Sequence, residues 1–240
     1  MLQAACAQRK SCGRYRRPPP ARHSRHETTG LPTPLSTGRA RNGLFRARIP
    51  RPPRLGINAM PTHDLAALWE AHCRYEFETR DVDATMATMV EAPYVNHVPT
   101  LTGGVGHDQL KRFYKYHFIG GNPPDTALTP VSRTIGTDQI VDEMIFSFTH
   151  TSEVDWMLPG VAPTGRRVEV PLVAIVRFVD GKVAHEHIYW DQASVLVQVG
   201  LLEPKGLPVA GIETARKVVD KTLPSNEMMP RWSSSAGKPL

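Results

Sequence analysis

The apolar positions between Met60 and Leu202 follow two different periods. In the first half of this stretch they recur every three to four residues, as on one face of an amphipathic helix. In the second half they alternate with polar positions, as in strands with one buried face. The predicted elements are helices over 65–73, 81–92 and 110–118 with a strand over 94–98 between the last two, strands over 126–135, 139–151, 167–179 and 182–189, and helices over 191–199 and 212–221.

Helices followed by a run of antiparallel strands predict an α+β fold, with the helices packed on one face of the sheet. Thr62 or Asp64 is expected to cap the first helix and Asp81 the second, and Gly103-Gly104 to form a turn before the third. We therefore expect one domain over residues 60–202 and a C-terminal extension over 203–240 that holds one short helix.

Residues 1–59 differ from the rest of the chain, because they are rich in Arg, Pro, Gly and Ser/Thr and have no apolar period. Such a segment cannot offset its ordering entropy by burial, so the sequence predicts disorder. The favoured interpretation is that translation starts at Met60 and that the upstream stretch is a start-site artefact. An organelle-targeting peptide and a basic interaction arm are the alternatives.

The charge is divided between these two parts. Residues 1–60 hold 13 Lys and Arg against one acid, a net of +12, and the remainder holds 16 bases against 22 acids, a net of −6. The acidic folded part argues against a nucleic-acid partner. No apolar run approaches the ~20 residues of a membrane span, and three cysteines make no disulfide framework, so a cytoplasmic location without membrane contact is expected.

A two-residue turn at Asp180-Gly181 defines the last predicted hairpin, since both positions of a type I′ turn need positive φ. The turn pairs Val179 with Lys182, and this pair sets every pair further along the strands. The predicted partners are Phe178 with Val183, Val176 with His185, Ala174 with His187, Leu172 with Tyr189, and Val170 with Asp191.

Because side chains alternate along a strand, this register places His185, His187, Tyr189 and Asp191 on one face, opposite apolar partners. Glu186 is expected on the other, mixed face. Desolvation by an apolar wall raises the pKa of a carboxyl and sharpens it as a base, and an imidazole or phenol can hold an enolate oxygen. The hairpin therefore predicts an acid–base pocket.

Each of these residues has a plainer interpretation. Asp191 lies where a strand meets a helix, and spacing alone slightly favours an N-cap role. Either His185 or His187 taken alone is more simply a half-buried strand residue. The His-x-His pair also suits a metal ion, with His97 or His150 as third ligand, which we keep as a minor hypothesis. Motifs of esterases, kinases, zinc proteases and nucleotide-dependent enzymes are absent from the sequence.

Several motifs together resemble the SnoaL-like polyketide cyclase branch of the nuclear-transport-factor-2 (NTF2-like) superfamily, over roughly Leu65 to Leu202. The motifs are Pro163-Thr164-Gly165-Arg166-Arg167-Val168, Phe178-Val179-Asp180-Gly181-Lys182-Val183, Glu186, Trp190-Asp191 and Gln198-Val199-Gly200-Leu201. They are specific for fold and weak for function, because this fold hosts many activities.

The resemblance implies a cone-shaped pocket, commonly a sheet-mediated homodimer, and, in the cyclases, an Asp base that closes a ring by an aldol reaction without a cofactor. Asp191 occupies the matching position, which favours its catalytic role over capping. The cyclases' assisting His has no counterpart on the neighbouring strand, which offers Arg177, Val176 and Ile175, so His187 or His185 would have to replace it.

The sequence thus predicts a cofactor-independent acid–base enzyme of the cyclase, isomerase or lyase type, acting on a small apolar carbonyl or lactone compound. Asp191 would be the base, with His187 and His185 holding the oxyanion. The predicted substrate-binding residues are Tyr189, His97, Phe178, Val176 and Leu172. The alternatives are a non-catalytic small-molecule-binding or dimerisation module and, as a minor one, a metal site on the histidine pair.

Overall fold

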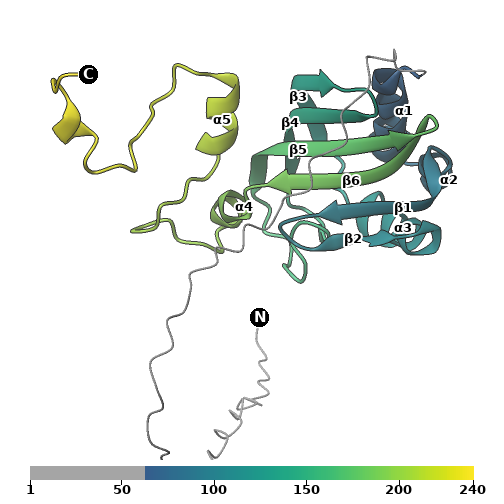
Figure 1. Cartoon of the computed structure of the whole chain (residues 1–240). Coiled ribbons are helices and arrows are strands. Elements are labelled where there is room, and N and C mark those ends of the chain that lie inside the picture. The colour runs from purple at the N-terminus through teal and green to yellow at the C-terminus, as the bar shows by residue number, and fades with distance from the viewer. Residues whose placement is uncertain (1–62) are drawn as a thin grey trace, which may run out of the picture. The chain divides into compact units, whose positions relative to one another are not determined.

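The computed structural model describes residues 63–240, so the predicted tail and the capping role of Thr62 lie outside the described residues. Figure 1 shows α1 to α3 grouped beside a sheet, with α4 at the other end of its last two strands. The elements are α1 (Leu65–Phe77), α2 (Val82–Ala87), β1 (Met89–His97), β2 (Thr102–Val105), α3 (His107–Phe113), the π-helical turn η1 (Tyr114–Phe118), β3 (Ala127–Ile135), β4 (Gln139–Thr149), β5 (Arg167–Val179), β6 (Lys182–Trp190), α4 (Gln192–Val199), α5 (Glu213–Val219) and the 3-10 turn η2 (Ser233–Ser235).

Short polar side chains begin three of the helices as the sequence predicts. Asp64 accepts a hydrogen bond from Ala67 N at 3.0 Å, and Asp81 accepts one from Ala84 N at 3.0 Å. Asp191 does the same for α4. Each carboxylate satisfies a backbone N–H that has no partner within its own helix. The N-terminal boundaries of these helices are therefore set locally.

The six strands form one curved, unclosed sheet in the order β2-β1-β6-β5-β4-β3. β1 runs parallel to β6 and all other neighbours are antiparallel, so the sheet is mixed. Side chains of the concave face alternate with exposed ones and form the core with α1, α3 and η1. The aromatic-rich face of β4, with Phe146 and Phe148, is buried. The predicted α+β fold, with helices packed on a curved sheet, is confirmed.

Two predicted boundaries between Asp81 and the third helix are wrong. The second helix ends at Ala87, and Met89 and Val90 already belong to β1, where Pro93 lies at an interruption of the pairing with β6. Gly103-Gly104 is not a turn but part of β2. A Cβ at Gly103 would lie 2.1 Å from the carbonyl oxygen of Val95, and its φ of 127° is a conformation that favours glycine.

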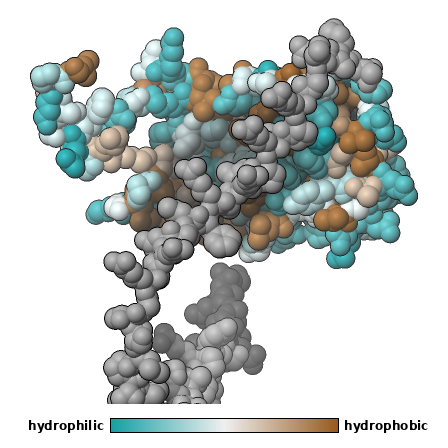
Figure 2. Space-filling model, in the orientation of Figure 1, coloured by the Kyte–Doolittle hydropathy of each residue, from teal (hydrophilic) through white to brown (hydrophobic). Residues whose placement is uncertain are grey.

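The predicted C-terminal extension packs against α4 over its first part. Ser194 of α4 donates a hydrogen bond to the carbonyl of Gly211 at 2.7 Å, just before α5. Beyond α5 the side chains are exposed, and Figure 2 shows a mainly hydrophilic surface there that is broken by a few apolar residues. Within residues 63–240, no helix is long and apolar enough to cross a membrane.

Candidate active site

The last hairpin begins with the predicted turn but soon leaves the predicted register. Asp180 and Gly181 both have positive φ, and Val179 pairs with Lys182. A β-bulge follows, in which Phe178 pairs with Val183 but Arg177 pairs with His185, so Ala184 is an additional residue. Because side chains alternate, one additional residue moves every later side chain to the other face. The observed partners are Val176 with Glu186, Ala174 with Ile188, and Leu172 with Trp190, and the predicted pairs beyond Val183 are wrong.

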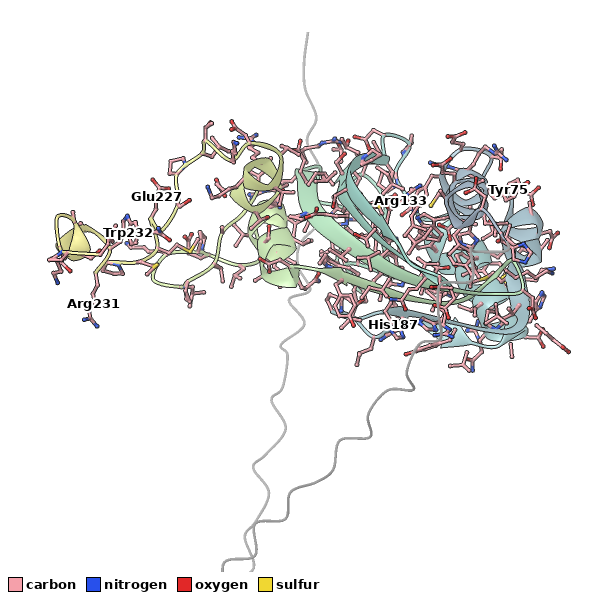
Figure 3. All side chains as sticks on the ribbon, turned by 45° about the horizontal axis from the view of Figure 1, so that its top comes forward. Tyr75, Arg133, His187, Glu227, Arg231 and Trp232 are labelled. Carbon is pink, nitrogen blue, oxygen red and sulfur yellow. The ribbon has the colours of Figure 1, made fainter. Side chains whose placement is uncertain are left out.

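His185, His187 and Tyr189 consequently lie on the outer face of the sheet. The two imidazoles stack with their centroids 4.7 Å apart, and Tyr94 packs edge-on against His187. Tyr189 is 42% exposed. In Figure 3, His187 projects from the side of the sheet that is turned away from α1, whereas Arg133 lies on the side of α1.

Neither His97 nor His150, the residues expected as a third metal ligand, is available to this histidine pair. His97 belongs to the buried concave face, and His150 is hydrogen-bonded to Thr164 at 3.1 Å. Burial and the charges of His187 and Arg177 lower the pKa of His185, which opposes protonation of its ring.

Asp191 is exposed and its Oδ1 accepts the N–H of Ser194 at 3.2 Å, which is the capping role and not a pocket role. Only some of the predicted binding residues line the cavity that is described next. Phe178 and Val176 are buried in the core without lining the cavity, whereas Leu172 and His97 do line it. Their part in binding stays a prediction.

The cavity lies between α1, η1 and the concave face of the sheet and has a volume of about 40 Å³. Most of its wall is apolar, and the ionisable groups on it come from α1, β1, η1 and β6. It is lined by Trp69, Cys73, Glu76, Phe77, Val95, His97, Tyr114, Phe118, Leu128, Met144, Phe146, Trp156, Leu172, Ala174, Glu186 and Ile188.

Two carboxylates on the wall of this cavity meet one imidazole that does not itself line it. His72 and Glu76 are one helical turn apart on the buried face of α1, and Glu186 arrives from β6 because of the bulge. The Nε2 atom of His72 lies 3.1 Å from Oε1 of Glu76 and 3.3 Å from Oε1 of Glu186. All three side chains are at most 4% exposed. We call His72, Glu76 and Glu186 the buried triad.

A threonine fixes the proton on the far side of the imidazole. The hydroxyl of Thr88 donates to the carbonyl of Thr85 at 2.6 Å, so its oxygen has only acceptor capacity left for Nδ1 of His72 at 2.5 Å. Nδ1 therefore carries a proton. Since Nε2 faces two carboxylate oxygens, a second proton must lie between Nε2 and one of these oxygens.

The electrostatics favour an imidazolium in that position. Burial lowers the pKa of His72, but the charges of Glu76 and Glu186 outweigh this effect and raise it from 6.5 to about 10. Burial raises the pKa of Glu76, with His72 acting against it. One cation and two carboxylates leave the triad with an excess of negative charge in an apolar wall, which is the setting of a base.

Tyr114 and His97 add hydrogen-bonding groups beside the triad. The hydroxyl of Tyr114 donates to Oε1 of Glu186 at 3.4 Å, longer than an ordinary O–H···O bond of about 2.7 Å. Burial raises the pKa of this phenol well above its ordinary value, so it stays a donor. Burial lowers the pKa of His97 to about 4, and its Nδ1 has no partner in the described part of the chain.

A second polar network, which includes Trp69, anchors α1 to the sheet next to the buried triad. The indole N–H of Trp69 donates to Asp142 at 2.9 Å, and Arg133 binds the same carboxylate through Nε and Nη2 at 2.9 Å each. Trp69 in turn stacks on His72, with ring centroids 5.3 Å apart. This network holds the helix that carries two members of the triad.

The buried triad is also the cluster in residues 63–240 with the spacing for a cation, since one ligand atom from each member lies within 4.8 Å of the others. Two carboxylates and an imidazole suit several divalent ions. In the geometry described, however, Nε2 of His72 is already engaged by both carboxylates.

Sequence reasoning missed the triad for two reasons. Glu186 was assigned to the mixed outer face because the bulge at Ala184 was not foreseen. His72 lies within the predicted first helix, 65–73, but Glu76 lies beyond its predicted end, although it continues the buried stripe that includes Leu65, Trp69 and His72. A carboxylate at i+4 from an inward-facing histidine was the available signal.

Comparisons with known proteins find similar solved structures and one matching family model. The structure is similar to TsrD from Streptomyces laurentii, with 19% identity over 58% of this chain and 99% of that chain and a TM-score of 0.46. It is similar to a putative SnoaL-like polyketide cyclase from Jannaschia sp. CCS1, with 20% identity over 62% and 100% of the two chains and a TM-score of 0.45. A putative polyketide cyclase from Acidithiobacillus ferrooxidans matches with 15% identity over 59% and 97% and a TM-score of 0.48.

None of the curated proteins matches this sequence significantly. The family model described as SnoaL-like polyketide cyclase matches residues 68–199, which is more than half of the chain and includes every strand of the sheet. With that match and the resemblance of its motifs, the chain belongs to the SnoaL-like polyketide cyclase family.

Proposed function

We propose that the protein is an acid–base enzyme of the cyclase, isomerase or lyase type that acts on a small apolar carbonyl or lactone compound without a cofactor. The observation that carries this proposal is that two carboxylates and a phenol line an apolar cavity and that an imidazole binds both carboxylates, with contacts of 3.1 to 3.4 Å within the group. Burying these charges costs stability, and a proton-transfer site is a reason to bear that cost.

Glu186 is the proposed base, since it reaches both the cavity and the cation of the triad. Its carboxylate would take the proton from the carbon next to the substrate carbonyl and return it to the product. Tyr114 would donate a hydrogen bond to the enolate oxygen. His72 would hold Glu186 in place as a positioning residue. A base and a donor of this kind each contribute about 10²-fold or more to the rate.

Exchange of hydrogen for deuterium next to a carbonyl tests this step without knowledge of the natural substrate. Small cyclic ketones and lactones are incubated with the protein in D₂O and followed by proton NMR. We expect catalysed exchange by the wild type, and a loss of about 100-fold or more in Glu186→Gln and in Tyr114→Phe.

His187→Ala is the matched control, because it removes an imidazole from the outer face and should leave exchange unchanged. Loss of exchange in His187→Ala together with retention in Glu186→Gln would contradict the proposal. Elemental analysis of the purified protein is the companion measurement, since a stoichiometric divalent ion would replace this mechanism with a metal site on the triad.

A second candidate function is ligand binding without turnover. It is favoured by the contacts within the triad, because both carboxylates are engaged by His72. Saturable binding of ketones to the wild type and to Glu186→Gln, with no exchange in either, is the result that it predicts.

A homodimer is also part of the proposal, through the outer face of the sheet. That face carries Tyr94, Val173, Ile175, His187 and Tyr189, of which the two tyrosines are more than one third exposed. Light scattering of the purified protein tests it, and Ile175→Glu should yield monomers. A cytoplasmic location stays a prediction that cell fractionation checks.

A further inference from the structure

A second hollow adjoins the cavity on the side of α1 and β3. It has a volume of about 490 Å³, compared with about 40 Å³ for the cavity. We call it the outer groove. Its wall is formed by α1, the start of β3 and two residues of β4, and it is lined by Glu70, Cys73, Arg74, Phe77, Glu78, Thr126, Leu128, Pro130, Arg133, Asp142 and Met144.

The cavity and the outer groove share four lining residues. Cys73 and Phe77 of α1 face Leu128 of β3 and Met144 of β4, and each of them lines both hollows. All four side chains lie at the boundary, so we call them the neck. Methionine, leucine and phenylalanine side chains can change rotamer without loss of a polar contact. The neck is therefore the natural passage between the groove and the triad.

The two volumes limit what the cavity can hold. A water molecule needs roughly 10–15 Å³ by this measure, so the cavity takes about three waters, or one small functional group with its nearest carbons. The rest of any larger ligand must lie beyond the neck. The outer groove supplies the space.

The polar groups of the groove favour a neutral ligand. Arg133 is already engaged by Asp142 and by Glu70, the latter at 2.9 Å, so its charge is compensated. Arg74 and Glu78 also line the groove and contribute one charge of each sign. The hydroxyl of Thr126 is different, because Oγ1 is buried and has no hydrogen-bond partner in the described residues. Such an unpaired buried group lowers the stability of the fold. A neutral oxygen of a ligand placed in the groove would satisfy it.

We propose that the ligand is an elongated, uncharged ketone or lactone whose carbonyl end passes the neck and reaches the triad. Its chain lies in the outer groove, where an ether, hydroxyl or ester oxygen accepts a hydrogen bond from Thr126. This inference rests on the proposed function in one respect, namely that the end of the ligand that reaches the triad is a carbonyl group. The length of the ligand and the place of its chain follow from the two hollows alone.

Straight-chain methyl ketones of four to ten carbons test the place of the chain. Their dissociation constants are measured by NMR titration, which needs no turnover. Each methylene buried in the groove should tighten binding about fourfold, so affinity should rise steadily along the series. A constant affinity, or no binding by any member, would overturn the inference.

Two substitutions locate the effect. Thr126→Trp and Pro130→Trp fill the groove at residues that do not line the cavity. In each variant the shortest ketone should bind as in the wild type, and the increase in affinity with chain length should disappear. Two positions are used in case one variant unfolds. Retention of the full gain in both folded variants would also overturn the inference.

Thr126→Val is the matched control, because it keeps the shape of the side chain and removes only the hydroxyl. Plain methyl ketones should bind to it as to the wild type, whereas a chain with an ether oxygen should bind about fivefold more weakly. Absence of deuterium exchange together with length-dependent binding would refute the proposed function alone. Exchange together with length-independent binding would refute this inference alone.

Discussion

Replacement of His72 by glutamine removes the cation of the buried triad and leaves its two carboxylates facing each other. Loss of one partner from a buried ion pair costs about 3–5 kcal/mol. The pKa gives a similar figure, since a rise from 6.5 to about 10 corresponds to roughly 5 kcal/mol in favour of the protonated ring. Because burial already raises the pKa of Glu76, that carboxyl can take up a proton in the variant and relieve part of the loss. We expect a loss of about 3 kcal/mol at neutral pH.

Urea denaturation of the wild type and His72→Gln as a function of pH measures this contribution. The folded pKa of His72 lies above the unfolded one, so the contribution is full below pH 6.5 and is lost as the pH rises toward 10. The difference in unfolding free energy should therefore be largest near pH 6.5 and should shrink toward pH 10. A difference that grows over this range would refute the imidazolium assignment.

Two further variants separate charge from other effects. His187→Gln makes the same change on the outer face and should cost less than about 0.5 kcal/mol. The triple variant His72→Leu, Glu76→Leu and Glu186→Leu removes every charge of the triad at once, and it should be within about 2 kcal/mol of the wild type or more stable. If this triple variant were far less stable than His72→Gln, packing and not unpaired charge would be the cause.

The remaining predictions concern the parts of the fold that hold the site. Gly103→Ala places a Cβ against the carbonyl of Val95 and should cost about 2–4 kcal/mol, whereas Gly160→Ala, also at positive φ but with nothing within 4 Å, should cost about 1 kcal/mol. Asp142→Ala leaves the indole N–H of Trp69 without its acceptor and Arg133 with Glu70 alone, and a loss of about 3 kcal/mol in urea denaturation is expected. Asp191→Ala should lower the free energy of unfolding by about 1 kcal/mol, whereas Asp191→Asn should stay near the wild type. Neither variant should alter deuterium exchange. A loss of exchange in Asp191→Asn would instead identify the carboxylate of Asp191 as the base.

The architecture was predictable because its signals are local. The caps at Asp64, Asp81 and Asp191 and the turn at Asp180-Gly181 depend on the few residues around them, and the change of period marks helices and strands. The start of β1 was not predictable, because Met89 and Val90 fit the apolar stripe of a helix equally well. Their pairing with a distant strand outweighs that local pattern.

The face on which the side chains of β6 lie was mispredicted because the register of a strand is not a local property. The turn at Gly181 sets the first pair, but the extra residue at Ala184 depends on how β6 also pairs with β1 on its other side, with its own interruption between Met89 and Tyr94. The alternation rule itself was correct. The predicted register is one residue out of step beyond Val183, so it places Glu186 on the outer face and the two histidines on the inner face.

Strand β6 therefore carries two complete sets of chemical groups, and the bulge selects between them. Glu186, Ile188 and Trp190 are turned inward, while His185, His187 and Tyr189 are one residue out of phase. Deletion of Ala184 would exchange the two sets and leave the turn at residues 180–181 intact. A single codon lost or gained at this point could convert a carboxylate-based interior into one with paired imidazoles, which gives relatives of this fold a short mutational route between different reactions.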